Sequence, residues 1–272
     1  MKLSSREYKI LTDEIKKVEK AESRLLFRRK KRKDESPGFI RKKIPEKTYL
    51  TLESAFEKAF RLIFNKGGGI IEKTSQLEKI RLQSEEFEES MHRMVHEGTI
   101  KAIDNLAASS AQNSKLIGTA DGSILGIAGM GLPDIPIFLG ILLKTCYGIA
   151  AGYGFDYRDP KEKKFTISVL KMAFSTGEAK AEYSRQCDEL ARAMVVGEAV
   201  DWEVTDEEIK EVSSILATDM LVAKFIQGFT LVGVVGGIFN YRLVHKINVS
   251  AKLKYKKRFL LNHLNRIQTE SS

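Results

Sequence analysis

The sequence is poor in cysteine, proline and aromatic residues. Its 272 residues include two cysteines, five prolines and one tryptophan, and aromatic side chains make up 8 % of the chain. Cys146 and Cys187 cannot form a disulfide framework and fit a reducing compartment, although one bridge between them stays open. Few turn residues and little β-branched alternation disfavour an all-β fold. Residues 1–14 lack the apolar stretch of a secretory signal peptide, so none is expected.

Charge is unevenly distributed along the chain. The net charge is +9, and residues 1–49, with 17 basic and 8 acidic residues, account for all of it. Residues 178–219 contain 12 acidic and 4 basic residues, whereas residues 242–266 contain 8 basic residues and no acidic one. This asymmetry predicts either partners that carry phosphate or internal contacts between segments of opposite sign.

Apolar residues recur with helical spacing along most of the chain. This spacing predicts helices over residues 3–27, 48–65, 84–111, 137–153, 178–196 and 248–267. Ser84 is expected to cap the third of them, after a short helix that ends near Leu82. Asp159 with Pro160, and Thr205 with Glu208, are typical starts of two further helices. The fold class predicted is therefore all-α.

Two segments, residues 116–155 and 225–240, are apolar and rich in glycine. In the first, Gly118, Gly122 and Gly126 are spaced by four residues, and the sequence Pro-Asp-Ile-Pro at 133–136 interrupts it. Proline cannot continue a helix, so the pattern indicates a helical hairpin with a corner at 133–136. We predict a multi-helix domain built around these two segments over residues 48–272, preceded by a basic amphipathic helix and linker over residues 1–47.

These glycine-rich segments are poor candidates for simple membrane spans. A spanning helix needs about 20 apolar residues. Residues 123–143 carry Asp134 between two prolines at mid-depth, and residues 137–155 carry Lys144. Charges at such depth are costly. Two interpretations stay open: buried core helices of a soluble domain, or a hairpin that enters one leaflet.

Carboxylates beside apolar stretches are the main candidates for a site. Asp121, Asp134 and Asp219 lie where an ionised group is costly unless it is paired. Each is expected either to cap a helix or pair with a lysine such as Lys144 or Lys224, or to form part of a polar, glycine-lined groove. The candidate groove consists of Gly118, Asp121, Gly122, Gly126, Gly129, Pro133, Asp134, Pro136, Asp219 and Asn240.

No motif identifies an active site, a cofactor site or a metal site. His92 and His96 are four residues apart, but the segment lacks the glutamate that follows the first histidine in a zincin. A P-loop, a dinucleotide fingerprint and a nucleophile elbow are also absent. We therefore predict no metal and no cofactor, leave the catalytic residues unassigned and favour a non-enzymatic protein.

Several short blocks of the sequence form a distinctive set: Lys43-Ile-Pro-Glu-Lys47, Gly118-Thr-Ala-Asp-Gly-Ser, Gly129-Met-Gly131-Leu-Pro-Asp134-Ile-Pro, Tyr153-Gly-Phe-Asp156, Asp159-Pro160-Lys-Glu162, Phe239-Asn240-Tyr241 and Arg258-Phe259-Leu260. Together these blocks resemble the bacterial EcsC protein family. The resemblance covers roughly residues 40–262. It implies a bacterial intracellular protein, from a family named after an operon that also encodes an ABC transporter. It implies no established chemistry and no accepted catalytic residues.

The expected function is attachment to the cytoplasmic face of the cell membrane, through anionic lipid or a membrane protein complex, as an accessory to transport or secretion. The candidate basic surface comprises Arg28, Arg29, Lys30, Lys31, Arg32, Lys33, Lys252, Lys256, Lys257 and Arg258. One alternative is an enzyme that acts on a lipid or peptide through the buried aspartates. A second is a nucleic-acid binder, which the scarcity of aromatic residues beside the basic runs disfavours. A basic run can also be a solvated linker.

Overall fold

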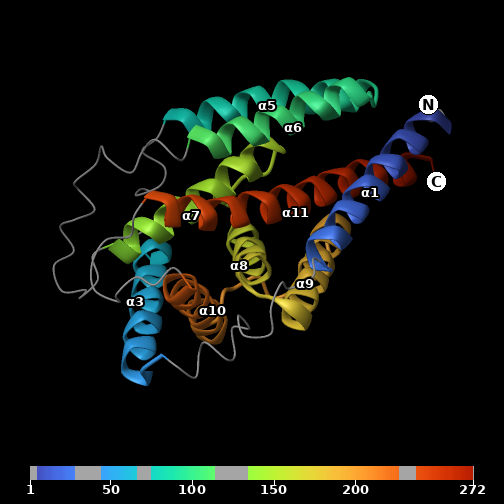
Figure 1. Ribbon diagram of the computed structural model, residues 1–272. Coiled ribbons are helices and arrows are strands. Elements are labelled where there is room, and N and C mark those ends of the chain that lie inside the picture. Colours follow the sequence, from blue (N-terminus) through green and yellow to red (C-terminus); the bar gives the residue numbers. More distant parts are fainter. Residues whose placement is uncertain (1–4, 28–43, 66–74, 114–133, 227–236, 272) are drawn as a thin grey trace.

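The computed structural model describes residues 5–27, 44–65, 75–113, 134–226 and 237–271 (Figure 1). These residues form helices and no strand, which confirms the predicted all-α fold class for this part of the chain. The helices are α1 (Ser5–Leu26), α3 (Glu46–Asn65), α5 (Ser75–Arg93), α6 (Glu97–Asn113), α7 (Asp134–Gly152), α8 (Pro160–Phe174), α9 (Gly177–Val196), α10 (Asp206–Ile226) and α11 (Gly237–Ser271).

The long helix α11 runs through the middle of the molecule and packs against α1, α6, α7, α8 and α9 (Figure 1). Along its second half, consecutive positions from Lys257 to Leu260 are all buried. Consecutive positions of a helix point in different directions, so this stretch is covered on every side. Apolar residues such as Tyr255 and Phe259 fill the contacts with α7 and α8. The basic residues on the same turns must then find partners inside the protein.

The helix α7 forms the apolar centre of the fold and packs against α3, α5, α6 and α11. Its residues Ile135–Gly152 are long and apolar enough to cross a membrane, alone among the described helices, and 78 % of this stretch is buried inside the protein. A core helix passes the same test of length and composition. At its end, a Cβ on Gly152 would lie 2.6 Å from the Cα of Ala107, so α6 and α7 approach closely only because residue 152 is glycine.

Local capping signals place two helix starts where the sequence predicts them. The Asp159 side chain accepts a hydrogen bond of 2.9 Å from the backbone N–H of Lys161, with Pro160 in the first turn of α8. Thr205 and Glu208 form a reciprocal capping box before α10: each side chain accepts from the backbone N–H of the other residue, at 3.2 and 2.9 Å.

The predicted boundary at Ser84 is wrong. Ser84 lies inside α5, where its buried hydroxyl donates to the carbonyl of Arg81 at 2.7 Å. The chain breaks instead at residues 94–96, between α5 and α6. There the backbone N–H of Val95 donates to the carboxylate of Glu7 at 3.0 Å. A partner on α1 thus satisfies this part of the break, which no local signal reveals.

The predicted glycine-rich hairpin is described only in its second half. The helix expected over residues 137–153 is α7, which begins at Asp134. Residues 116–133, and residues 227–236 of the second glycine-rich segment, lie outside the described residues.

Candidate functional site

The basic residues of α11 point into the protein. Lys254, Lys257 and Arg258 are 1 %, 7 % and 2 % exposed. The prediction that Lys257 and Arg258 belong to a basic surface is therefore wrong. Lys256 is largely covered and ion-paired, which also removes it from such a surface, and Lys252 is half-buried. The physical reason is the position of α11, which neighbouring helices enclose and supply with carboxylates.

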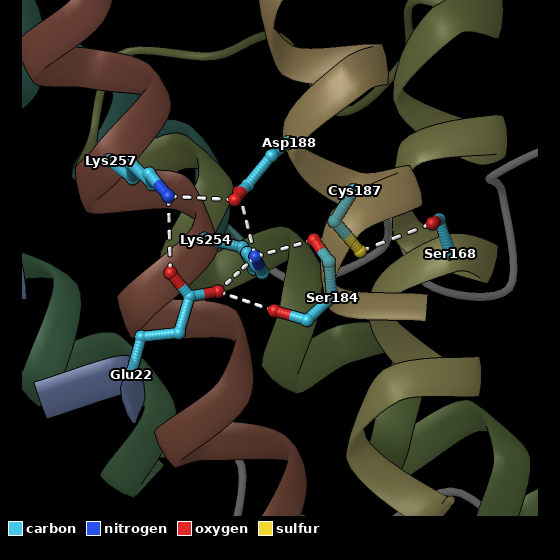
Figure 2. Close-up of polar contacts among 7 residues, drawn as sticks. All are labelled: Glu22, Ser168, Ser184, Cys187, Asp188, Lys254 and Lys257. Carbon is cyan, nitrogen blue, oxygen red and sulfur yellow. Dashed lines mark hydrogen bonds and ion pairs between the residues drawn. The ribbon is translucent and has the colours of Figure 1, made fainter. Parts of the chain in front are cut away.

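Two of these lysines and two carboxylates from other helices form a closed arrangement, called here the charge ring. Its members are Glu22 of α1, Asp188 of α9, and Lys254 and Lys257 of α11 (Figure 2). The two oxygens of Asp188 accept from Lys254 and Lys257, each at 2.7 Å. The two oxygens of Glu22 bind the same two lysines, with Lys257 at 3.1 Å. Positive and negative groups therefore alternate, and the ring is neutral as a whole.

Every polar group around Lys254 is engaged. Its ammonium donates to Glu22, to Asp188 and to the carbonyl of Ser184 at 2.7 Å, which uses its three donors. Burial raises the pKa of Glu22, but the charges and hydrogen bonds of Lys254, Ser184 and Lys257 outweigh it, so that this pKa lies below its usual value. The hydroxyl of Ser184 donates to Glu22. A lysine with all donors engaged in ion pairs and hydrogen bonds offers no general base to Ser184, so the geometry favours a structural role.

The thiol beside the ring is buried as well. Figure 2 shows Cys187 of α9 facing Ser168 of α8, with Sγ and Oγ 3.1 Å apart. Burial raises the pKa of Cys187 to about 11, and burial also raises the pKa of Cys146. Reactive cysteines need a thiolate and access to solvent, so neither thiol suits nucleophilic chemistry.

A second buried ion pair joins Arg258 to Glu162 at the start of α8. The guanidinium carbon of Arg258 lies 3.5 Å from the ring centre of Phe155 and 4.6 Å from that of Phe165. Burial raises the pKa of Glu162, and the charge of Arg258 opposes this shift without cancelling it. Stacking on aromatic rings suits the weakly hydrated guanidinium and helps to hold it in the core.

This contact unites blocks on which the sequence resemblance rests. The block 153–156 contributes Phe155, the block 159–162 contributes Glu162, and the block 258–260 contributes Arg258. The rings of Tyr153 and Phe259, from the first and last of these blocks, lie 5.8 Å apart. Segments about a hundred residues apart in sequence thus meet in the core, which indicates that these motifs hold the fold together.

A third group of charges ties α1 and α6 to α11. The ammonium of Lys256 donates to Glu14 at 2.8 Å and to Asp104 at 2.7 Å. The hydroxyl of Tyr153 donates to the other oxygen of Asp104 at 2.8 Å. Burial lowers the pKa of Lys256, but its two carboxylate partners outweigh burial and raise it overall.

Of the predicted groove, the structure describes few side chains. Asp219 of α10 pairs with a lysine, as one of the two interpretations expects, but the partner is Lys246 of α11, at 2.6 and 2.8 Å. Pro136 is buried in α7, Asp134 begins that helix, and Asn240 lies in α11. The other predicted groove residues, Gly118, Asp121, Gly122, Gly126, Gly129 and Pro133, lie outside the described residues, as do Arg28 to Lys33 of the basic run.

Two of the four histidines contact the same glutamate. The Nε2 atoms of His92 and His263 lie 3.7 and 3.2 Å from Oε2 of Glu88, and His96 lies in the break between α5 and α6. Within the described ranges, no group of three or more histidine, cysteine, aspartate or glutamate residues is arranged to hold a metal ion.

Sequence reasoning missed two cavities on the described part of the molecule. The first, of about 360 Å³, lies between α8 and α9, and its lysines are neutralised: Lys164 pairs with Glu208 and Lys171 with Glu211. The second, of about 330 Å³, lies at the ends of α3, α8 and α10 and is lined in part by Trp202. The chain contains one tryptophan, and its position is the sequence signal that could have drawn attention to the second cavity.

The chain belongs to the EcsC protein family, whose family model matches residues 10–260. The match begins inside α1, upstream of residue 40. The chain is 26 % identical over 160 residues to "Protein EcsC" of Bacillus subtilis (strain 168), a match that covers 58 % of this chain and 64 % of that protein. It is 28 % identical over 104 residues to "Uncharacterized protein YdbA" of the same strain, covering 36 % and 38 %.

The matched regions thus span less than two thirds of the length of either relative. No solved structure matches the chain.

Proposed function

We propose that the protein is a non-enzymatic helical protein that binds anionic lipid at the cytoplasmic face of the cell membrane through residues 28–33. The observation that carries this proposal is that the basic segment near the end of the chain is largely paired within the protein. The eight basic residues of 242–266 include Lys246, Lys254, Lys256, Lys257 and Arg258, and each of these five has a carboxylate partner inside the protein. The six consecutive bases of 28–33 form the densest positive run elsewhere in the chain.

The side chain that precedes this run supports the proposal. Phe27, the residue after α1, is 78 % exposed, more than any other large hydrophobic residue in the described part of the chain. Aromatic residues favour the membrane interface, and bases beside them favour anionic headgroups. Each base near an anionic surface contributes about 1 kcal/mol, and this attraction weakens as salt screens it.

Liposome flotation tests the proposal. The protein is expected to float with vesicles of phosphatidylglycerol and phosphatidylcholine, and to remain at the bottom with phosphatidylcholine alone. Added salt should release it, because the attraction is electrostatic. Equal binding to both vesicles, indifferent to salt, would contradict the proposal, and tighter binding to duplex DNA than to anionic vesicles would favour the nucleic-acid alternative.

A further inference from the structure

The cavity of about 330 Å³ lies where α3 ends and where α8 and α10 begin. Its lining includes two aromatic side chains, Phe64 and Trp202, and two basic ones, Arg61 and Lys163. A third base, Lys161, lies beside it, with its ammonium 5.7 Å from the ring centre of Trp202. Aromatic rings and positive charges from α3, from α8 and from the residues before α10 therefore surround one cavity.

The two lysines differ from those of α11 in what surrounds them. The ammonium of Lys163 lies 5.9 Å from the ring centre of Phe64. Within the described part of the chain, neither Lys161 nor Lys163 has a carboxylate at ion-pair distance; each contacts an aromatic face. A ring attracts a cation through its quadrupole but does not neutralise it. Both ammonium groups therefore keep donors for an anion.

The third base, Arg61, can bind an anion with little loss of stability. Arg61 pairs with Asp206, and their side chains are 43 % and 69 % exposed. Such exposed ion pairs contribute little, so the guanidinium can exchange its partner. Glu203 also lines the cavity. The three bases and two acids leave one net positive charge, which favours an anionic group over a neutral one.

We infer that this cavity binds a phosphate group, with Arg61, Lys161 and Lys163 as its donors and Trp202 as an apolar wall. Guanidinium and ammonium groups are the usual phosphate partners, and tryptophan is enriched at boundaries between apolar and hydrated regions. The phosphate can come from an anionic lipid headgroup or from a soluble phosphate compound. The lipid source rests on the proposed function and gives it a second contact, separate from residues 28–33.

Because Trp202 is the chain's one tryptophan, its fluorescence reports on this cavity alone. The intact protein is titrated with phosphatidylglycerol vesicles, with phosphatidylcholine vesicles and with glycerol 3-phosphate. The test variant is Arg61→Gln with Lys163→Gln. The matched control is Lys79→Gln with Lys101→Gln, which removes two exposed bases from α5 and α6, away from the cavity.

We expect a phosphate-bearing probe to change the emission, and the test variant to bind at least tenfold more weakly than the control, since a charge-assisted hydrogen bond contributes about 1.5–3 kcal/mol. A response to vesicles alone assigns the site to lipid, and a response to glycerol 3-phosphate assigns it to a soluble compound. Unchanged emission with every probe, or equal affinities for the test variant and the control, overturns the site. Flotation that persists without an emission change leaves the role of residues 28–33 intact, whereas an emission change without flotation refutes only lipid attachment.

Discussion

At the scale of single residues, the molecule is distinguished by cations that lie inside it. Lys254 is 1 % exposed and donates to two carboxylates and a carbonyl, and Lys257 closes the charge ring with the same two carboxylates. A buried ion pair gains little over an apolar contact, but removing one partner leaves a charge uncompensated. The ring therefore joins α1, α9 and α11 in one arrangement, because any displacement separates charges from their partners.

Removing one member of the ring should be costly. Lys254→Ala leaves Glu22 and Asp188 sharing one lysine inside the protein, so we expect it to lower the free energy of unfolding by about 3–5 kcal/mol. Lys252→Ala, on the same helix and half-buried, should change it by less than about 1 kcal/mol. Urea unfolding measures both. Equal stabilities of the two variants would mean that the ring contributes nothing to holding the helices together.

The ring should also make stability depend on pH. The pKa of Glu22 is lower in the folded protein than its usual 4.5, so its ionised form stabilises the fold above that value. This contribution is lost as the pH falls through the folded pKa. Between pH 5 and pH 3 the unmodified protein should therefore lose more stability than Glu22→Gln, as followed by urea unfolding at each pH. Glu162, whose pKa burial raises, acts in the opposite direction but is present in both proteins and cancels. Parallel curves would exclude a role for Glu22.

At the scale of elements, local signals predict helix starts well where the partners are near in sequence. Asp159 and Thr205 cap α8 and α10 as predicted, because each hydrogen bond joins residues two or three apart. The break after α5 escaped prediction because Glu7, about ninety residues away, caps Val95. The partner of Asp219 is also distant in sequence. The sequence predicts a lysine partner for this residue but does not identify it as Lys246.

Two glycines of α7 give a matched test of its packing. A Cβ on Gly152 would meet the backbone of Ala107 at 2.6 Å, whereas a Cβ on Gly140 would meet nothing within 4 Å. Gly152→Ala should therefore lower the free energy of unfolding by about 1–3 kcal/mol through overpacking. Gly140→Ala should raise it by about 0.5–1 kcal/mol, because alanine favours helix more than glycine. Thermal unfolding compares them, and a Gly152→Ala variant as stable as Gly140→Ala would contradict the close approach of α6 and α7.

At the scale of the whole molecule, the distribution of charge has two distinct consequences. Sequence alone left open whether the basic segment 242–266 meets phosphate or the acidic segment 178–219. The structure resolves much of this: Lys254 and Lys257 bind Asp188, and Lys246 binds Asp219. Lys254 and Lys257 meet carboxylates because neighbouring helices bury them, and burial is a property of the whole fold rather than of the helix. The proposed function assigns the other dense positive run, residues 28–33, to the membrane surface.

The most direct test of the account compares two variants of equal charge in liposome flotation. One replaces the six bases of residues 28–33 with glutamine. The other replaces six scattered, exposed bases with glutamine: Lys47, Lys58, Lys79, Lys101, Arg192 and Lys210. We predict that the first variant loses flotation with phosphatidylglycerol vesicles and that the second, with the same net charge, retains most of it. Equal flotation of the two variants would contradict the assignment of membrane attachment to residues 28–33.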